Sequence, residues 1–306
     1  SAYTSISALW YAVGRKIDTL STPPHCKHNT KNMTAANTTH VTNTSDSTTA
    51  TSSAVIYHAL PYYPTVLLDR FAPFSQQPWA MLLHSGFADH PHNRFDIMVA
   101  DPRVTLCTRE GKTEITRDGV TFTVEGDPFT LLQEQLDSLT LSAETHSDFP
   151  FQGGALGLFG YDLGRQIETL PTQAERDINL PDMAVGLYDW ALVADHHQQT
   201  LTLIVHHSLH ARLDWLATPP VETPKANFSL TSVWQPNMSR DAYGEKFHKI
   251  QDYLLAGDCY QVNLAQRFSA TYAGDEWQAF LQLSAGNKAP FSAFLRLPEN
   301  AVISVS

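Results

Sequence analysis

The stretch Trp79-Ala80-Met81-Leu82-Leu83-His84-Ser85-Gly86 decides the class of fold, because it predicts a buried strand that ends at a turn. Two further apolar strands are predicted after it, over Phe95–Ala100 and Val104–Thr108, and Gly119–Val124 alternates between apolar and polar residues at period two. Asp127-Pro128 then begins a helix. Strands and helices are mixed without the regular alternation of a parallel sheet, which predicts the α+β class.

The second half of the chain continues this mixture. Two apolar runs, Ala184–Ala194 and Thr200–His206, flank the polar residues 195–199 and predict a hairpin. Farther on, Ser239 is expected to cap a helix whose apolar residues recur at helical spacing, and Gly257 is expected to end it.

Composition divides the chain into four parts. Residues 1–53 are rich in Ser, Thr and Asn and cannot bury enough apolar surface to offset their ordering entropy, so we expect a disordered tail. The stretch Pro219–Pro236 carries four prolines and marks the expected boundary between domains. We therefore predict a domain over 54–210, a linker over 211–237 and the start of a second domain over 238–306.

Charge and composition exclude several classes of function. The net charge of −11 would repel nucleic acid, and the longest apolar stretch is far shorter than the roughly 20 residues of a membrane span. Cys26, Cys107 and Cys259 are odd in number and far apart, which fits a reducing cytoplasm better than a disulfide framework. If the substrate is an anion, converging Arg and Lys side chains or a bound metal ion must supply positive charge.

Two segments, one rich in glycine and one rich in amides, could serve either a structural role or a binding site. The glycines of Phe151–Asp162 resemble a phosphate loop, but no Lys-Ser/Thr pair accompanies them. Close packing of glycine-rich strands is favoured, with Tyr161 and Asp162 held by hydrogen bonds. The segment Gly257–Phe268, interpreted as a strand, would gather amides and a guanidinium on one face. That face is either the floor of a polar pocket or a solvated sheet surface.

Seven histidines fall in two groups without the ligand spacing of a zinc site. We expect them to be exposed residues of loops and strand ends. They are His90, His92, His196, His197, His206, His207 and His210.

The segment Glu299–Ser306 predicts a turn and then a strand that no Gly, Pro or Asn closes. Ile303 and Val305 should form its buried face, and Ser304 and Ser306 its polar face. Because native domains rarely leave such an edge unprotected, we expect the chain to be a fragment of a longer protein.

Five segments together resemble the chorismate-utilising enzymes, the family of anthranilate synthase component I. The matching segments are Leu82–Ser85, Gly153–Asp162, Leu180–Asp189, Gly257–Phe268 and Asn287–Phe291, in the family's order and spacing over residues 53–306. The resemblance implies antiparallel sheets packed as a sandwich with flanking helices, incomplete at the C-terminus. It makes 54–210 the family's N-terminal domain and 238–306 the truncated start of its chorismate-binding domain.

The activity that the resemblance implies is amination of chorismate for folate and p-aminobenzoate synthesis. Ammonia would come from a glutamine amidotransferase subunit in a heterodimer, and Mg²⁺ held by glutamates would bind the dicarboxylate substrate. The family's catalytic lysine, general acid and metal ligands are expected beyond residue 306, so we expect this chain by itself to be inactive. Two alternatives are the tryptophan-pathway branch of the family and a non-catalytic module that binds tryptophan.

The resemblance also implies a pocket for L-tryptophan, with apolar walls for the indole and polar groups for the zwitterion. The alternative is that Phe95, Pro290 and Phe291 are only core residues. The residues carried over are Ser85, His92, Asn93, Arg94, Phe95, Pro290, Phe291 and Ser292.

Overall fold

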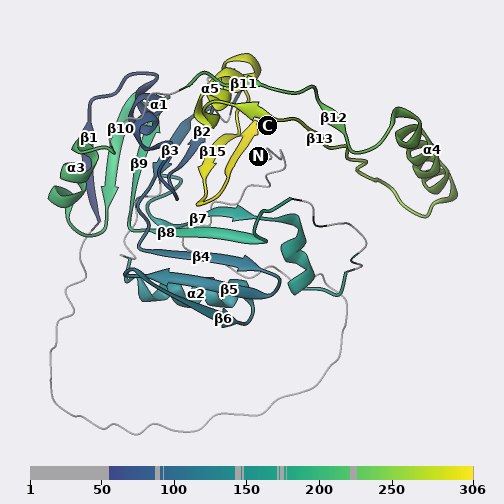
Figure 1. The fold of residues 1–306 in the computed structure, drawn as a ribbon. Helices are drawn as coiled ribbons and strands as arrows, with labels where there is room; N and C mark the ends of the chain where they lie inside the picture. The colour runs from purple at the N-terminus through teal and green to yellow at the C-terminus, as the bar shows by residue number, and fades with distance from the viewer. Residues whose placement is uncertain are drawn as a thin grey trace, which may run out of the picture.

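The computed structural model describes residues 55–86, 90–91, 93–141, 146, 148–170, 172, 176, 178–220 and 226–305. The predicted tail over 1–53 lies outside the described residues. Within them, two large antiparallel sheets lie one above the other (Figure 1). No helix in these ranges is long and apolar enough to cross a membrane.

The larger sheet has seven strands in the order β1-β10-β9-β3-β2-β15-β16, and every neighbouring pair is antiparallel. Its strands are β1 (Ile56–Leu60), β10 (Thr200–Val205), β9 (Trp190–Asp195), β3 (Phe95–Val99), β2 (Met81–His84), β15 (Ser292–Arg296) and β16 (Ala301–Val305).

The smaller sheet has five strands in the order β6-β5-β4-β8-β7. These are β6 (Val120–Glu125), β5 (Lys112–Arg117), β4 (Val104–Arg109), β8 (Met183–Tyr188) and β7 (Gly154–Phe159). One core cluster joins residues of both sheets, with Met81 and Val193 of the larger sheet beside Leu156 and Ala184 of the smaller one. The predicted sandwich and α+β class are confirmed.

Helices cover the outer faces. On the larger sheet, α1 (Val66–Phe71), η1 (Ala72–Phe74), α3 (Leu209–Ala217) and α5 (Glu276–Asn287) pack into a second core cluster. On the smaller sheet, α2 (Pro128–Ser138) buries Leu131 and Leu132 in a third cluster. The side chain of Asp127 accepts a hydrogen bond from the backbone N–H of Thr130, which confirms the predicted helix start.

The predicted apolar run Ala184–Ala194 is two strands and not one. β8 ends at Tyr188 in the five-stranded sheet, and β9 begins at Trp190 in the seven-stranded sheet. Every residue of both strands is buried, so their apolar pattern is continuous and conceals the crossing between sheets. The hairpin is confirmed for β9 and β10 only.

The glycine-rich segment packs as expected. Gly157 of β7 lies so close to β8 that a Cβ atom placed on it would come within 2.1 Å of the Ala184 carbonyl oxygen. Asp162, in η2 (Tyr161–Gln166), pairs with Arg165 at 2.9 Å. Tyr161 is 96% exposed, so the expectation that it is held in the structure is wrong.

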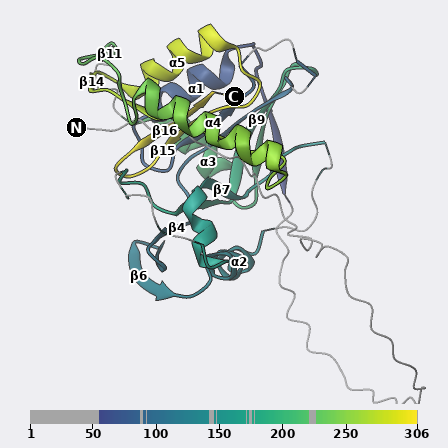
Figure 2. The same cartoon turned by 90° about the vertical axis from the view of Figure 1, so that its right-hand side faces the viewer.

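The helix predicted after Ser239 is confirmed as α4 (Arg240–Ala256). Ser239 caps it, and Gly257 ends it at a left-handed φ of 82°. None of its residues is buried. In Figure 1 it stands apart from the sandwich at the right, and in Figure 2, seen from that side, it lies in front. The chain runs out to α4 and back as two antiparallel segments, which pair in two short ladders. These are β11 (Ser229–Leu230) with β14 (Tyr272–Ala273), and β12 (Gln235–Pro236) with β13 (Phe268–Ser269).

The strand predicted over Gly257–Phe268 is wrong except at Phe268, where β13 begins. Residues 259–267 form neither helix nor strand, and Tyr260 is 99% exposed. No neighbouring strand pairs with them, and an extended segment without a paired neighbour or a face to bury is not stabilised as a strand. The segment therefore forms no sheet face, and its role as the floor of a polar pocket stays a prediction.

The last strands lie in the larger sheet. β15 pairs with β2, with Ser292 opposite His84, and β16 lies outside β15. The predicted strand at the end of the chain is confirmed. The prediction that Ser304 lies on a polar face is wrong: it is buried like Ile303, because the larger sheet is covered on both faces. Ser306, the other residue of that predicted face, lies outside the described residues. The linker predicted over 211–237 begins inside α3, which spans Leu209–Ala217. The division of the chain into domains over 54–210 and 238–306 stays a prediction.

Candidate functional site

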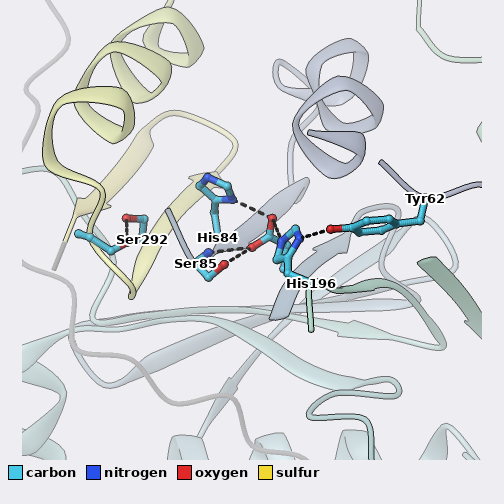
Figure 3. Close-up of polar contacts among 7 residues, drawn as sticks. Tyr62, His84, Ser85, His196 and Ser292 are labelled. Carbon is cyan, nitrogen blue, oxygen red and sulfur yellow. Dashed lines mark hydrogen bonds and ion pairs between the residues drawn. The ribbon is translucent and has the colours of Figure 1, made fainter. Parts of the chain in front are cut away.

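A row of polar side chains crosses one end of the larger sheet. Asp96 on β3 lies opposite Ala194, two residues before His196, and His84 on β2 lies opposite Ser292 on β15. Opposite residues of an antiparallel ladder point to the same face, so these side chains can lie in one row although they come from β2, β3, β15 and the turn after β9. Figure 3 shows Ser292, His84 and His196 in this row, with Tyr62 at its far end.

The centre of the row is the carboxylate of Asp96, which is 1% exposed. Its Oδ1 accepts hydrogen bonds from the backbone N–H of Ser85 at 2.8 Å and from the Ser85 hydroxyl at 2.9 Å. Its Oδ2 lies 2.9 Å from Nδ1 of His84 and 2.9 Å from Nε2 of His196. Burial alone would raise the pKa of Asp96, but the hydrogen bonds from His196 and His84 outweigh it and hold the pKa well below its usual range. Asp96 is therefore a buried, fully partnered anion.

His196 connects this carboxylate to Tyr62. Its Nδ1 lies 2.9 Å from the Tyr62 hydroxyl, and its Nε2 lies 2.9 Å from Oδ2 of Asp96 as a charge contact. Burial would lower the pKa of His196, but its hydrogen bond to Asp96 and the charge of that carboxylate outweigh burial and raise the pKa. Burial and the charge of Asp96 both raise the pKa of Tyr62.

This raised pKa predicts a pH-dependent stability. The protonated form of His196 is favoured in the folded state, so its stabilisation is fully present below the ordinary histidine pKa of about 6.5 and is lost as the pH rises through the raised value. Chemical unfolding of wild type and His196→Gln should differ most near pH 5.5 and progressively less above it. The variant His197→Gln, at an exposed neighbouring position, controls for the type of substitution. A difference that grows with rising pH would contradict the prediction.

The two segments of the predicted tryptophan pocket meet in the structure. Gly86, with a φ of 67°, lies so close to Ala289 that a Cβ atom placed on it would be 2.2 Å from the Ala289 carbonyl oxygen. The ring of His90 lies 6.2 Å from that of Phe291, centroid to centroid. Ser85 and Ser292 are each 2% exposed. The segment after β2 and the segment before β15 therefore form one locus.

The remaining predicted residues lie around this locus. Arg94 pairs with Asp195 at 2.8 Å, and its guanidinium lies 4.5 Å from the centre of the Phe95 ring. The backbone N–H of Asn93 donates to the carbonyl oxygen of His90 at 2.9 Å. Pro290 is partly buried and His92 lies outside the described residues. Phe291 is 51% exposed, so the interpretation of it as a core residue is wrong, whereas Phe95 does pack against the core between the sheets.

Sequence reasoning missed the centre of the row, Asp96. The available signal was a single charged residue inside the otherwise apolar strand predicted over Phe95–Ala100. The expectation that the histidines are exposed holds for His90, His197, His207 and His210. It is wrong for His196, which is partly buried, and for His206, which is 2% exposed and lies 2.5 Å from the Gln152 carbonyl oxygen.

Two further features of the described residues bear on ligands. No group of three His, Cys, Asp or Glu side chains among them could hold a metal ion. A cavity of about 230 Å³ lies away from the polar row, between β4 and β5 and the turn that joins β15 to β16, and its lining includes Arg109, Glu114 and Glu299.

Comparison with known proteins gives a family match and several relatives. The family described as chorismate binding enzyme matches residues 83–306. The chain is 58% identical over 251 residues to aminodeoxychorismate synthase component 1 of Klebsiella aerogenes, which covers 81% of this chain and 55% of that protein. The protein of the same name from Escherichia coli (strain K12) is 57% identical over 236 residues, covering 77% of this chain and 52% of that protein.

More distant relatives carry another name. Anthranilate synthase component 1 of Mycobacterium tuberculosis (strain ATCC 25618 / H37Rv) is 27% identical over 280 residues, covering 81% of this chain and 54% of that protein. The crystal structure of anthranilate synthase component I from Streptococcus pneumoniae TIGR4 matches with a TM-score of 0.52 at 24% identity, over 68% of this chain and 48% of that chain, and supports the fold alone. The chain spans about half the length of the curated relatives it matches.

Proposed function

The chain belongs to the chorismate binding enzyme family, and on this premise we propose that the whole protein aminates chorismate to 4-amino-4-deoxychorismate. The observation that supports this branch is the identity of 58% to an aminodeoxychorismate synthase component 1, against 27% to an anthranilate synthase component 1 over a similar share of the chain. The product would serve folate and p-aminobenzoate synthesis.

The proposal includes a partner and a metal ion. The name component 1 that the relatives carry implies a second component, and we propose a glutamine amidotransferase that delivers ammonia. Magnesium would neutralise part of the charge of a dicarboxylate on a protein whose net charge is −11. The proposal for magnesium concerns the whole protein, of which this chain spans about half. We also place the protein in the cytoplasm, where free thiols such as Cys107 and Cys259 stay reduced.

The experiment compares the 306-residue chain with a version extended to the full length of its relatives. Each is incubated with chorismate, ammonium and magnesium, and products are identified by mass. The extended protein should form 4-amino-4-deoxychorismate and the 306-residue chain should not. Formation of anthranilate would instead support the tryptophan-pathway branch, and no consumption of chorismate by the extended protein would refute the proposal.

We further propose that the locus around Ser85 and Ser292 binds L-tryptophan. The approach of the segments after β2 and before β15, the half-exposed ring of Phe291 and the guanidinium of Arg94 on the ring of Phe95 support an indole site with polar groups at one end. Calorimetric titration of the chain with L-tryptophan tests it.

The variant Gly86→Ala should weaken this binding. A Cβ atom there would overlap the Ala289 carbonyl oxygen, and its φ of 67° disfavours any side chain, so the two segments would separate. Tryptophan affinity should fall by at least about tenfold, as the loss of a buried contact of about 1.4 kcal/mol gives. Gly111→Ala, at a φ of 81° with nothing within 4 Å, controls for backbone strain alone and should bind normally. Equal affinity in both variants would contradict the assembly of the pocket from these segments.

A further inference from the structure

We propose that β6 is a self-association surface, through which two copies of this chain pair antiparallel and join their five-stranded sheets into one. β6 stands at the end of the strand order β6-β5-β4-β8-β7, at the bottom of the smaller sheet in Figure 1. Among the described residues, no strand pairs with its outer edge. The polar row, by contrast, lies on the larger sheet.

The outer edge of β6 lacks the usual protection of a strand edge. Its residues, Val120–Glu125, include no Pro and no Lys, and its pairing with β5 continues through every position without a bulge. The apolar side chains of Val120 and Phe122 are 63% and 44% exposed. A flat, partly apolar edge of this kind is one to which another strand can add.

The turn between β5 and β6 determines which backbone groups of β6 face outward. Asp118 and Gly119, with φ of 50° and 77°, form a two-residue hairpin loop of the type I′ kind. In such a hairpin the flanking residues, Arg117 and Val120, exchange backbone hydrogen bonds, and bonded pairs then alternate along the ladder. The N–H and C=O groups of every second residue, beginning at Thr121, therefore point away from β5. These residues are Thr121, Thr123 and Glu125.

The sequence of β6 is symmetric about Phe122. Outward from this residue, both directions give Thr and then Val, in the order Val120-Thr121-Phe122-Thr123-Val124. When two copies pair about a two-fold axis through Phe122, each Thr lies opposite a Thr, each Val opposite a Val, and Phe122 opposite its own copy. The outward-pointing residues Thr121 and Thr123 then exchange backbone hydrogen bonds across the interface. A second copy of the chain is therefore the partner that this edge matches residue for residue.

Both faces of this pairing are favourable. Phe122 lies opposite Ile115, on the face that α2 covers, yet its ring remains 44% exposed. At the two-fold axis the two Phe122 rings form a pair without backbone hydrogen bonds, where side chains approach most closely, and cover each other. On the opposite face, the hydroxyls of Thr116 and Thr121 share a hydrogen bond at 2.8 Å. Thr121 opposite Thr123 of the second copy continues this cross-strand series.

No like charges face each other in this register. Glu125 is the one charged residue of β6, lies opposite Gly119 of the second copy and pairs with Lys112 at 3.6 Å. The net charge of −11 repels two copies, but salt at physiological concentration screens charges that are more than about 8 Å apart. Association should therefore strengthen with ionic strength, whereas an interface built on ion pairs would weaken.

Sedimentation equilibrium of the 306-residue chain at about 0.15 M salt tests the association. Wild type should show a monomer–dimer equilibrium. Thr123→Pro removes an outward N–H and no hydrogen bond to β5, a position at which an edge strand tolerates proline. Phe122→Lys places like charges opposite each other at the axis. Each variant should raise the dissociation constant of the dimer at least about tenfold, because symmetry applies each change twice.

The control for these variants is Val233→Lys, at a residue that is 74% exposed and lies outside β6. It should associate as wild type does, and thermal melts should show that all three variants remain folded. Wild type that stays monomeric at every concentration would overturn the inference. So would a dimer that Thr123→Pro and Phe122→Lys leave as tight as wild type, since another surface would then hold it.

Cross-linking tests the register. In Phe122→Cys the introduced thiols of two copies lie opposite each other at the axis, within reach of a disulfide. In Thr123→Cys they occupy diagonal positions about 7–8 Å apart, beyond that reach. Under mild oxidation, non-reducing electrophoresis should show a covalent dimer for Phe122→Cys, above the background that the native cysteines give in wild type. Equal cross-linking of Phe122→Cys and Thr123→Cys would contradict the pairing about Phe122.

Discussion

The variant Trp277→Ala should lower the free energy of unfolding by about 3–5 kcal/mol, the range for emptying a buried tryptophan site. Trp277 of α5 is 1% exposed. Its ring lies 5.0 Å from that of Phe71, 5.2 Å from that of Phe280 and 5.3 Å from that of Phe294, centroid to centroid. These rings join α1, α5 and β15, so the cavity would open where segments from both ends of the described chain meet.

Denaturant unfolding followed by circular dichroism measures this effect. One cooperative transition should move as a whole, because α5 and β15 belong to the same core as α1. Trp234→Ala, at a residue that is 51% exposed, is the matched control and should change the midpoint little. A variant in which a separate transition of residues 238–306 shifts alone would instead favour the predicted division into domains.

The variant Gly157→Ala should be nearly as damaging, with a loss of about 3 kcal/mol from overpacking. The added methyl group would lie 2.1 Å from the Ala184 carbonyl oxygen and 2.7 Å from the Cα atom of Val185. Both atoms belong to the backbone of β8, which is paired with β7 and cannot move without breaking ladder hydrogen bonds. The two strands would have to separate where β7 forms one edge of the smaller sheet.

The control for this variant is Gly286→Ala in α5. Nothing lies within 4 Å of the Cβ atom that it adds, and alanine favours a helix over glycine by up to about 1 kcal/mol. Thermal melts should therefore move in opposite directions for the two variants. Equal melting temperatures for Gly157→Ala and wild type would contradict the close packing of β7 on β8.

Much of the fold could be predicted because its signals are local. The alternation in Gly119–Val124 predicts β6, and the caps Asp127, Ser239 and Gly257 predict helix ends, since each depends on residues a few positions apart. The crossing at Asp189 could not be predicted, because strands buried on both faces carry no periodic mark of the sheet they belong to.

Only those residues of the site that lie in local sequence motifs could be predicted. Ser85 and Ser292 were found through motifs, but what holds them depends on strand order. Asp96 and His196 are a hundred positions apart in sequence, and only the neighbouring places of β3 and β9 bring them together. The burial of a histidine also depends on residues that are distant in sequence. His196 lies against Asp96 and His206 against the Gln152 carbonyl oxygen, which explains why the prediction that they are exposed was wrong.

The place of β15 beside β2 has a consequence for biosynthesis. β2 emerges early from the ribosome, yet the strand that occupies its far edge is nearly the last of the described residues to be made. Until then the nascent sheet offers unpaired backbone groups of an apolar strand to any other chain nearby. Such distant pairing also slows folding, since a long loop must close before the contact forms. Cells that make this protein should therefore depend on chaperones during its translation, and slowing translation should increase aggregation of the nascent chain.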